Sequence, residues 1–125
     1  MKKTIILNNK QIQYKTKRIA YQIYENNIDE NKIIIAGIEK NGYLFAEKIK
    51  EELEKISPIT PILCKVNIDK KNLLSPITTS LSPLDYKNKS LILVDDVLNS
   101  GATLIYAVKH FLNVPLKNFK TAVLV

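Results

Sequence analysis

The chain has 125 residues, 46% of them hydrophobic and 25% charged, a composition typical of one compact globular domain. Its longest apolar runs, Ile33–Ala36 and Leu91–Val94, are far shorter than the roughly 20 residues that a membrane-spanning helix needs, so we expect no membrane protein. One cysteine and one histidine exclude an internal disulfide and a His/Cys metal site, and the formal charge of +7 favours polyanionic partners such as RNA or phosphate-rich small molecules.

The amino terminus is basic at Met1–Lys3 and continues into the short apolar run Thr4–Leu7. That run is too short for the apolar region of a signal peptide, and polar residues follow it directly. We therefore expect a cytoplasmic protein.

The first half of the chain predicts a helix, a strand and a second helix. The first helix covers residues 9–26, where one face carries, at helical spacing, Ile12, Thr16, Ile19 and Ile23. Lys32–Ile38 is rich in β-branched residues and predicts a buried strand. The second helix runs from Asn41 or Gly42 to about Ile56, with an inner face of Phe45, Ile49 and Leu53.

The second half predicts two more strands around a loop, then a helix and a last strand. Ile62–Ile68 is the first of these strands, and residues 69–89, rich in polar residues and proline, predict a long exposed loop with Ile77–Thr79 as its only strand fragment. Leu91–Asp95 is the strongest candidate for a buried strand. The pattern ends with a helix over Ala102–Leu112, which turns Leu104, Val108 and Phe111 inward, and a strand over Thr121–Val125.

Strands separated by helices predict parallel pairing through right-handed crossovers. The fold class is therefore α/β, with a mostly parallel sheet covered by helices on both faces. Such folds bind ligands at the carboxyl ends of their strands. The residues that follow Lys32–Ile38, Ile62–Ile68 and Leu91–Asp95 are the places to look for a site.

Residues 91–103 concentrate polar chemistry at the end of the strongest strand. The strand delivers Asp95 and Asp96 to its tip, and a turn of small residues leads into a helix. The first turn of that helix offers unpaired N–H groups and the positive end of the helix dipole, so Asn99–Thr103 predicts a phosphate cradle. The carboxylates suit the vicinal hydroxyls of a ribose, with Mg²⁺ nearby. The alternative is an aspartate pair followed by an ordinary helix cap.

This segment resembles the 5-phosphoribosyl-1-pyrophosphate binding motif of the type I phosphoribosyltransferases, an apolar run, two acidic residues and a small-residue turn of the form Ser/Thr-Gly-x-Thr; every defining position matches. Within that family the nearest resemblance is to the pyrimidine-operon attenuation regulators that are also uracil phosphoribosyltransferases. Residues 18–25 and 35–42 carry it, followed by an apolar helix over Tyr43–Leu53. The resemblance covers nearly the whole chain and implies a Rossmann-like type I phosphoribosyltransferase core.

The resemblance implies roles residue by residue. Asp95 and Asp96 bind the ribose hydroxyls and share Mg²⁺ with the substrate. The implied 5-phosphate loop consists of Asn99, Ser100, Gly101, Ala102 and Thr103, and the implied pyrophosphate loop of Glu39, Lys40, Asn41 and Gly42.

The pyrophosphate loop departs from the family pattern in its charge. Relatives often have arginine where Glu39 and Asn41 stand, whereas here only Lys40 is cationic. Lys70 and Lys71 fall where relatives begin a mobile, arginine-containing loop that closes over the pyrophosphate, so the resemblance implies that these lysines supply the missing charge.

The implied activity is transfer of 5-phosphoribosyl from phosphoribosyl pyrophosphate to a nucleobase, with uracil favoured, Mg²⁺ required and pyrophosphate released. In the family, further strands form a hood over the nucleobase, whereas this sequence stops at Val125. The expectation is a single domain over residues 1–125 that is either truncated or a minimal core, and the base pocket is not apparent.

Two other functions were compatible with parts of the pattern. An RNA-binding regulator would use the basic surface and keep the site as a nucleotide sensor. A phospho-acceptor receiver domain also has paired aspartates at a strand end, but here only one predicted strand follows the pair, which excludes that fold.

Three kinds of residue outside the motif have ordinary interpretations. Tyr14, Tyr21 and Tyr24 on the first helix indicate packing against a partner helix, as in a homodimer. His110 is interpreted as a solvated residue near a helix C-terminus, and Cys64 as a small buried hydrophobe.

Overall fold

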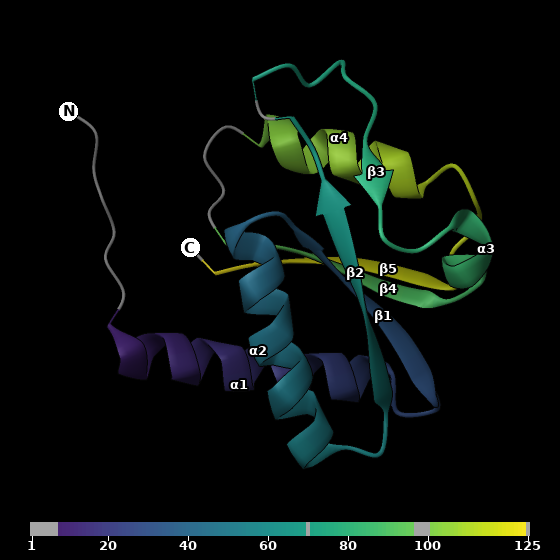
Figure 1. Cartoon of the computed structure of the whole chain (residues 1–125). Helices are drawn as coiled ribbons and strands as arrows, with labels where there is room; N and C mark the ends of the chain where they lie inside the picture. The colour runs from purple at the N-terminus through teal and green to yellow at the C-terminus, as the bar shows by residue number, and fades with distance from the viewer. Residues whose placement is uncertain (1–7, 70, 97–100, 125) are drawn as a thin grey trace.

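The computed structural model describes residues 8–69, 71–96 and 101–124. In chain order its elements are α1 (Asn9–Asn26), β1 (Lys32–Ile38), α2 (Asn41–Ile56), β2 (Thr60–Asn67), β3 (Thr78–Thr79), α3 (Pro83–Tyr86), β4 (Ser90–Asp95), α4 (Ala102–Phe111) and β5 (Asn118–Val123) (Figure 1). In the described part of the chain, no helix combines the length and apolar character that crossing a membrane requires.

The sheet has the strand order β3-β2-β1-β4-β5. β1 pairs in parallel with β2 and β4, β4 pairs in parallel with β5, and β3 alone is antiparallel. The predicted mostly parallel α/β fold is confirmed. From β1 the chain moves outward through α2 to β2, and from β4 it moves outward in the other direction through α4 to β5. The strand order therefore reverses between β1 and β4, which is where open α/β sheets form a ligand crevice.

Helices cover both faces of the sheet, with α1 and α2 on one side and α3 and α4 on the other (Figure 1). Alternate residues of β1 divide the core between these layers. Ile33 and Ile35 pack with the inner face of α2, whereas Ile34 and Ala36 belong to the cluster that contains Phe111 of α4. Because β1 is buried on both faces, it gives the crevice a fixed floor.

The strand fragment predicted at Ile77–Thr79 is confirmed as β3, but the prediction of a loop over residues 69–89 is wrong at α3. Ser82 and Asp85 start α3 with a capping box, in which the Asp85 carboxylate accepts a hydrogen bond from the Ser82 N–H at 2.8 Å. Tyr86 at the end of α3 is only 1% exposed and packs edge-on against Phe111, with 5.1 Å between ring centroids. One buried aromatic residue thus anchors a segment of polar composition.

Other boundaries differ slightly from the predicted ones. β2 begins at Thr60 rather than Ile62, and β5 begins at Asn118 rather than Thr121. The strands are longer because their polar first residues pair with β1 and β4, and pairing partners are not visible in local composition.

Two residues with ordinary interpretations have different outcomes. Cys64 is buried as predicted, and burial raises the pKa of its thiol. The expected solvated position of His110 is wrong, because the ring is half-buried and meets Phe111 edge-on at 5.5 Å between centroids. Burial lowers the pKa of His110, which disfavours the charged form of the imidazole.

Candidate functional site

The turn after β1 contains the predicted pyrophosphate loop. The Glu39 N–H donates a hydrogen bond to the Val66 carbonyl of β2 at 2.8 Å, and the peptide bond from Glu39 to Lys40 is cis. Lys40 is the N-cap of α2 but makes no side-chain cap, and the first turn of α2 has no acidic residue. Lys40 and Asn41 are exposed, so the positive end of the helix faces solvent at this turn.

Gly42 joins this turn to the tip of β4. A Cβ atom at Gly42 would lie 2.9 Å from the Val94 carbonyl oxygen and 3.1 Å from both the Cα and an Oδ atom of Asp95. Real Cβ atoms have no room at such distances from backbone, so a residue without a side chain is required. The sequence-predicted pyrophosphate loop and acidic pair therefore lie in direct contact.

A second glycine makes the same close packing possible. A Cβ atom at Gly37 of β1 would lie 2.5 Å from the Cα of Tyr43 in the first turn of α2. Gly37 and Gly42 together let the backbone of α2 lie directly against β1 and β4. The turn is thus held in place by backbone contacts.

The two aspartates have different environments. Asp95 is only 5% exposed, and its carboxylate accepts a hydrogen bond from the Asp96 N–H at 2.9 Å. Its carbonyl accepts from the Leu124 N–H at 3.3 Å, which ties the end of β5 to the same place. Asp96 follows the end of β4 and is half-buried. Asp95 is therefore the buried carboxylate of the pair, and Asp96 is the more exposed one.

The described part of the predicted 5-phosphate loop is Gly101–Thr103. Gly101 has the left-handed backbone conformation, φ 81°, that favours glycine, and it is the N-cap of α4. Its carbonyl accepts the Ile105 N–H at 2.9 Å. The predicted residues Asn99 and Ser100 lie outside the described residues, as does Lys70.

Lys71 lies in the exposed connection after β2. Its N–H donates to the Asp69 carboxylate at 2.9 Å, which closes a local turn. The structure thus gives Lys71 contacts within its own loop, and its predicted role over the pyrophosphate stays a prediction.

Lys65, which the sequence analysis did not single out, contacts the turn after β1 that contains the predicted pyrophosphate loop. The Lys65 ammonium of β2 lies 3.7 Å from the Glu39 carboxylate and 4.9 Å from the centroid of the Tyr43 ring. Lys65 pairs with Gly37 in the parallel register between β2 and β1. A lysine within an otherwise largely apolar strand was the available signal, but its partner depends on that register.

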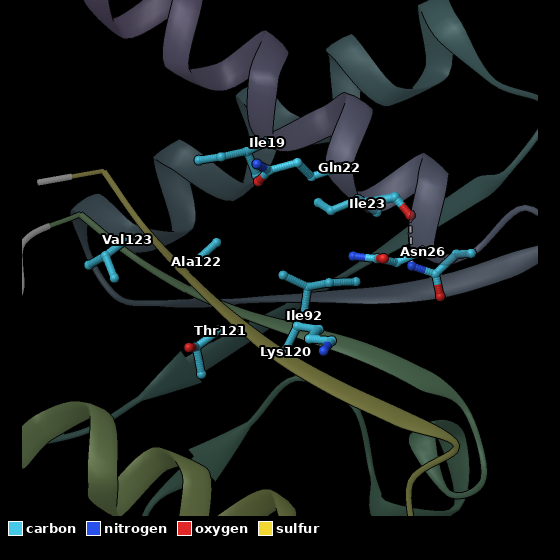
Figure 2. Close-up of a pocket in the computed structure, with 10 residues that line it drawn as sticks. Ile19, Gln22, Ile23, Asn26, Ile92, Lys120, Thr121, Ala122 and Val123 are labelled. Carbon is cyan, nitrogen blue, oxygen red and sulfur yellow. Dashed lines mark hydrogen bonds between the residues drawn. The ribbon is translucent and has the colours of Figure 1, made fainter.

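A groove of about 320 Å³ lies elsewhere, between α1 and β5 (Figure 2). Ile19, Gln22 and Ile23 of α1 line it together with Lys120 and Ala122 of β5. Because the described residues of the predicted loops are not among its lining, we place the candidate site at the open strand ends rather than in this groove.

The donor set at the strand ends fits a magnesium ion shared with a ligand. Among the described residues, no cluster of three or more His, Cys, Asp or Glu side chains could hold a metal ion unaided. Mg²⁺ is commonly held by one or two carboxylates together with substrate phosphates. Asp96, next to the buried Asp95, provides a carboxylate for such sharing.

Comparison with known proteins gives one consistent result. Residues 3–125 match the phosphoribosyl transferase domain family. The bifunctional protein PyrR of Streptococcus pneumoniae (strain CGSP14) is 34% identical over 115 residues, which cover 88% of this chain and 65% of that protein. PyrR of strain ATCC BAA-334 / TIGR4 gives the same values. The chain thus spans about 65% of the length of these curated relatives.

Solved structures agree on the fold. A hypoxanthine-guanine phosphoribosyltransferase from Bacillus anthracis superposes with a TM-score of 0.76 at 20% identity, covering 97% of this chain and 70% of that one. The hypoxanthine phosphoribosyl transferase of Trypanosoma cruzi gives a TM-score of 0.79 at 14% identity, covering 97% and 67%. At these identities the likeness concerns the arrangement of helices and strands.

Proposed function

Since this chain belongs to the phosphoribosyl transferase domain family, we propose that it binds phosphoribosyl pyrophosphate and transfers the 5-phosphoribosyl group to a nucleobase. In this reaction the bond from the anomeric carbon to pyrophosphate oxygen breaks, a bond to a base nitrogen forms, pyrophosphate leaves, and the proton of that nitrogen passes to solvent. The transition state has oxocarbenium character, so the chain must position two highly charged groups around a ribose.

One observation carries the proposal, namely the contact of Gly42 with Val94 and Asp95 at the reversal of strand order. It joins an uncapped helix start, suited to a diphosphate, with the acidic strand tip, suited to ribose hydroxyls. Gly101–Thr103, at the start of α4, follows the same strand and suits the 5-phosphate. We propose that these three segments together bind the substrate in the crevice.

Different residues bind different parts of the substrate in this proposal. Asp96, with Asp95 behind it, accepts hydrogen bonds from the ribose hydroxyls and orients the sugar. The backbone N–H groups at Asn41–Tyr43 bind the pyrophosphate, and Lys40 and the predicted Lys70 and Lys71 add positive charge around it. Mg²⁺ carried in with the substrate offsets the charge of the leaving pyrophosphate. We propose uracil as the acceptor, on the resemblance of residues 18–25 and 35–42 to the uracil-using members of the family.

Ligand-induced stabilisation tests the proposal. Phosphoribosyl pyrophosphate with Mg²⁺ at about ten times its dissociation constant should stabilise the fold by about 1.4 kcal/mol, or roughly 5 °C in melting temperature. A nicotinamide dinucleotide at the same concentration should have no effect. If the melting temperature does not change at millimolar phosphoribosyl pyrophosphate, the proposal is wrong. Release of pyrophosphate in the presence of uracil, hypoxanthine or guanine then identifies the acceptor.

A second function, binding of RNA by a regulator that senses nucleotides, is favoured by the exposed face of α1. Lys10, Lys17 and Arg18 are exposed there, Tyr14 and Tyr21 are 64% and 52% exposed, and the Arg18 guanidinium lies 5.9 Å from the Tyr14 ring centroid. Cations interleaved with aromatic rings suit phosphates and unstacked bases. The interpretation of all three tyrosines as partner packing does not extend to Tyr24, which packs against the chain's own core.

The RNA proposal predicts a salt dependence that single residues control. Replacing both Lys17 and Arg18 by glutamine should lower the slope of log affinity against log salt by about 2, since each phosphate contact contributes about 1. Filter binding of a pyrimidine-rich RNA measures this slope. Replacing both Lys55 and Lys89 by glutamine removes the same two charges at exposed positions outside α1 and is the charge-matched control. An unchanged slope rejects this face as the RNA site.

A homodimer formed through the same face of α1 would appear in sedimentation velocity as a doubled mass.

A further inference from the structure

The pyrophosphate turn contains a charge of the wrong sign. Glu39 is its first residue, and a diphosphate bound at the start of α2 would carry several negative charges. Two like charges about 4 Å apart repel each other in water, and they repel more strongly at the lower effective dielectric of a protein surface. A diphosphate can bind here favourably only when the Glu39 carboxylate is held away from it or neutralised.

Lys65 lies where it can both hold the Glu39 carboxylate away from a diphosphate and neutralise its charge. Its N–H donates to the Ser80 hydroxyl at 2.8 Å and its carbonyl accepts from the Ser80 N–H at 2.9 Å, so Ser80, directly after β3, holds its backbone on one side. On the other side Lys65 is in register with Gly37, which has no side chain. The space beside Gly37 admits the first turn of α2, and the Lys65 ammonium lies near the Tyr43 ring of that turn.

The end of the Lys65 side chain meets two groups of the turn. The ammonium lies 3.7 Å from a carboxylate oxygen of Glu39 and 4.9 Å from the Tyr43 ring centroid. The Glu39 backbone is tied to β2 as well, through its N–H bond to Val66 at 2.8 Å. Both the main chain and the carboxylate of Glu39 thus contact β2. Gly42, at the other side of the turn, contacts Asp95 of β4, and β2 and β4 lie on opposite sides of β1.

We propose that Lys65 is a positioning residue for diphosphate binding, which holds the Glu39 carboxylate on the β2 side of the turn and so keeps a negative charge away from the bound pyrophosphate. The inference rests on the proposed function. The Lys65 and Glu39 side chains are 43% and 35% exposed, and pairs this exposed contribute little to stability. The pair therefore acts on ligand affinity far more than on folding.

A double-mutant cycle tests the role. The variants are Lys65→Met, Glu39→Gln and the two together, and calorimetry measures the dissociation constants of Mg²⁺–phosphoribosyl pyrophosphate and of Mg²⁺–pyrophosphate alone. With Glu39 present, Lys65→Met should raise the dissociation constants of both ligands about fivefold, since the freed carboxylate then repels the diphosphate. In the Glu39→Gln background the same change should weaken them less than about twofold, because only a distant charge is lost.

Two controls separate position from net charge. Lys55→Met removes the same charge from the far end of α2, where Lys55 pairs with Glu52, and should leave both affinities unchanged. Lys65→Arg keeps the ion pair and should bind as the unsubstituted chain does. Melting temperatures of all variants should agree closely, so that lost binding is not lost folding.

The outcomes are distinct. If Lys65→Met weakens binding equally with and without Glu39, Lys65 contacts the phosphates itself and the positioning role is wrong. If it changes nothing in either background, Glu39 needs no restraint and the role is again wrong. If phosphoribosyl pyrophosphate fails to bind but Mg²⁺–pyrophosphate binds and the cycle behaves as expected, the positioning role stands while the proposed function fails. Binding of neither ligand to the unsubstituted chain overturns both.

Discussion

Replacing Gly42 by valine is expected to abolish measurable binding of phosphoribosyl pyrophosphate and to lower the free energy of unfolding by about 3 kcal/mol. The new Cβ would lie 2.9 Å from the Val94 carbonyl oxygen and 3.1 Å from the Asp95 Cα. Both are backbone atoms of a fully buried strand, so they cannot move aside and α2 has to shift. The uncapped helix start would then no longer face the acidic tip of β4.

Urea unfolding and calorimetric titration measure the two effects of Gly42→Val. Asn41→Val is the stability control, because it introduces the same side chain one residue earlier at an exposed position and should change the free energy of unfolding by less than about 0.5 kcal/mol. Tight ligand binding by Gly42→Val would show that the turn does not need its contact with β4.

The second large effect is that the two aspartates have different roles. Asp96→Asn should weaken the binding of phosphoribosyl pyrophosphate by about 2 kcal/mol, roughly 30-fold, because charge-assisted hydrogen bonds to the ribose are lost. The melting temperature should stay unchanged, because Asp96 is only half-buried. Asp95→Ala should instead lower the free energy of unfolding by about 2 kcal/mol, because the Asp96 N–H loses the acceptor that it reaches at 2.9 Å.

Asp95→Asn provides the matched comparison, since an amide oxygen can still accept the Asp96 N–H. Its melting temperature should stay near that of the unsubstituted chain. Thermal unfolding and calorimetry on the four proteins separate the roles. Equal losses of affinity for Asp95→Asn and Asp96→Asn, with no loss of stability in Asp95→Ala, would mean that both carboxylates face the ligand equally.

Much of the architecture could be predicted because its determinants are local. The spacing of Phe45, Ile49 and Leu53 specifies the face of α2, and the apolar runs of β1 and β4 specify strands buried on both sides. Alternation of helices and strands then restricts the topology to parallel pairing. The order of elements and both helical layers follow from these signals.

What the sequence did not reveal depends on contacts between distant segments. Tyr86 is an anchor only because Phe111 lies across from it, and nothing near Tyr86 in the sequence predicts that. Asp95 and Asp96 look equivalent along the chain, but Gly42 lies against Asp95, and the Asp95 carboxylate accepts the Asp96 N–H, so their environments differ. Lys65 reaches Glu39 through the register of β2 with β1, which local patterns do not specify.

The way in which the turn after β1 is built has a consequence for how such a site can evolve. Its shape comes from glycines at 37 and 42, whereas Lys40 and Asn41 between them are exposed. Sequence drift at the two exposed positions can therefore alter the charge presented to a ligand without remodelling the backbone that receives it. Selection on affinity and selection on folding act here on different residues, so a lineage can lose or regain strong anion binding by single substitutions while the scaffold persists unchanged.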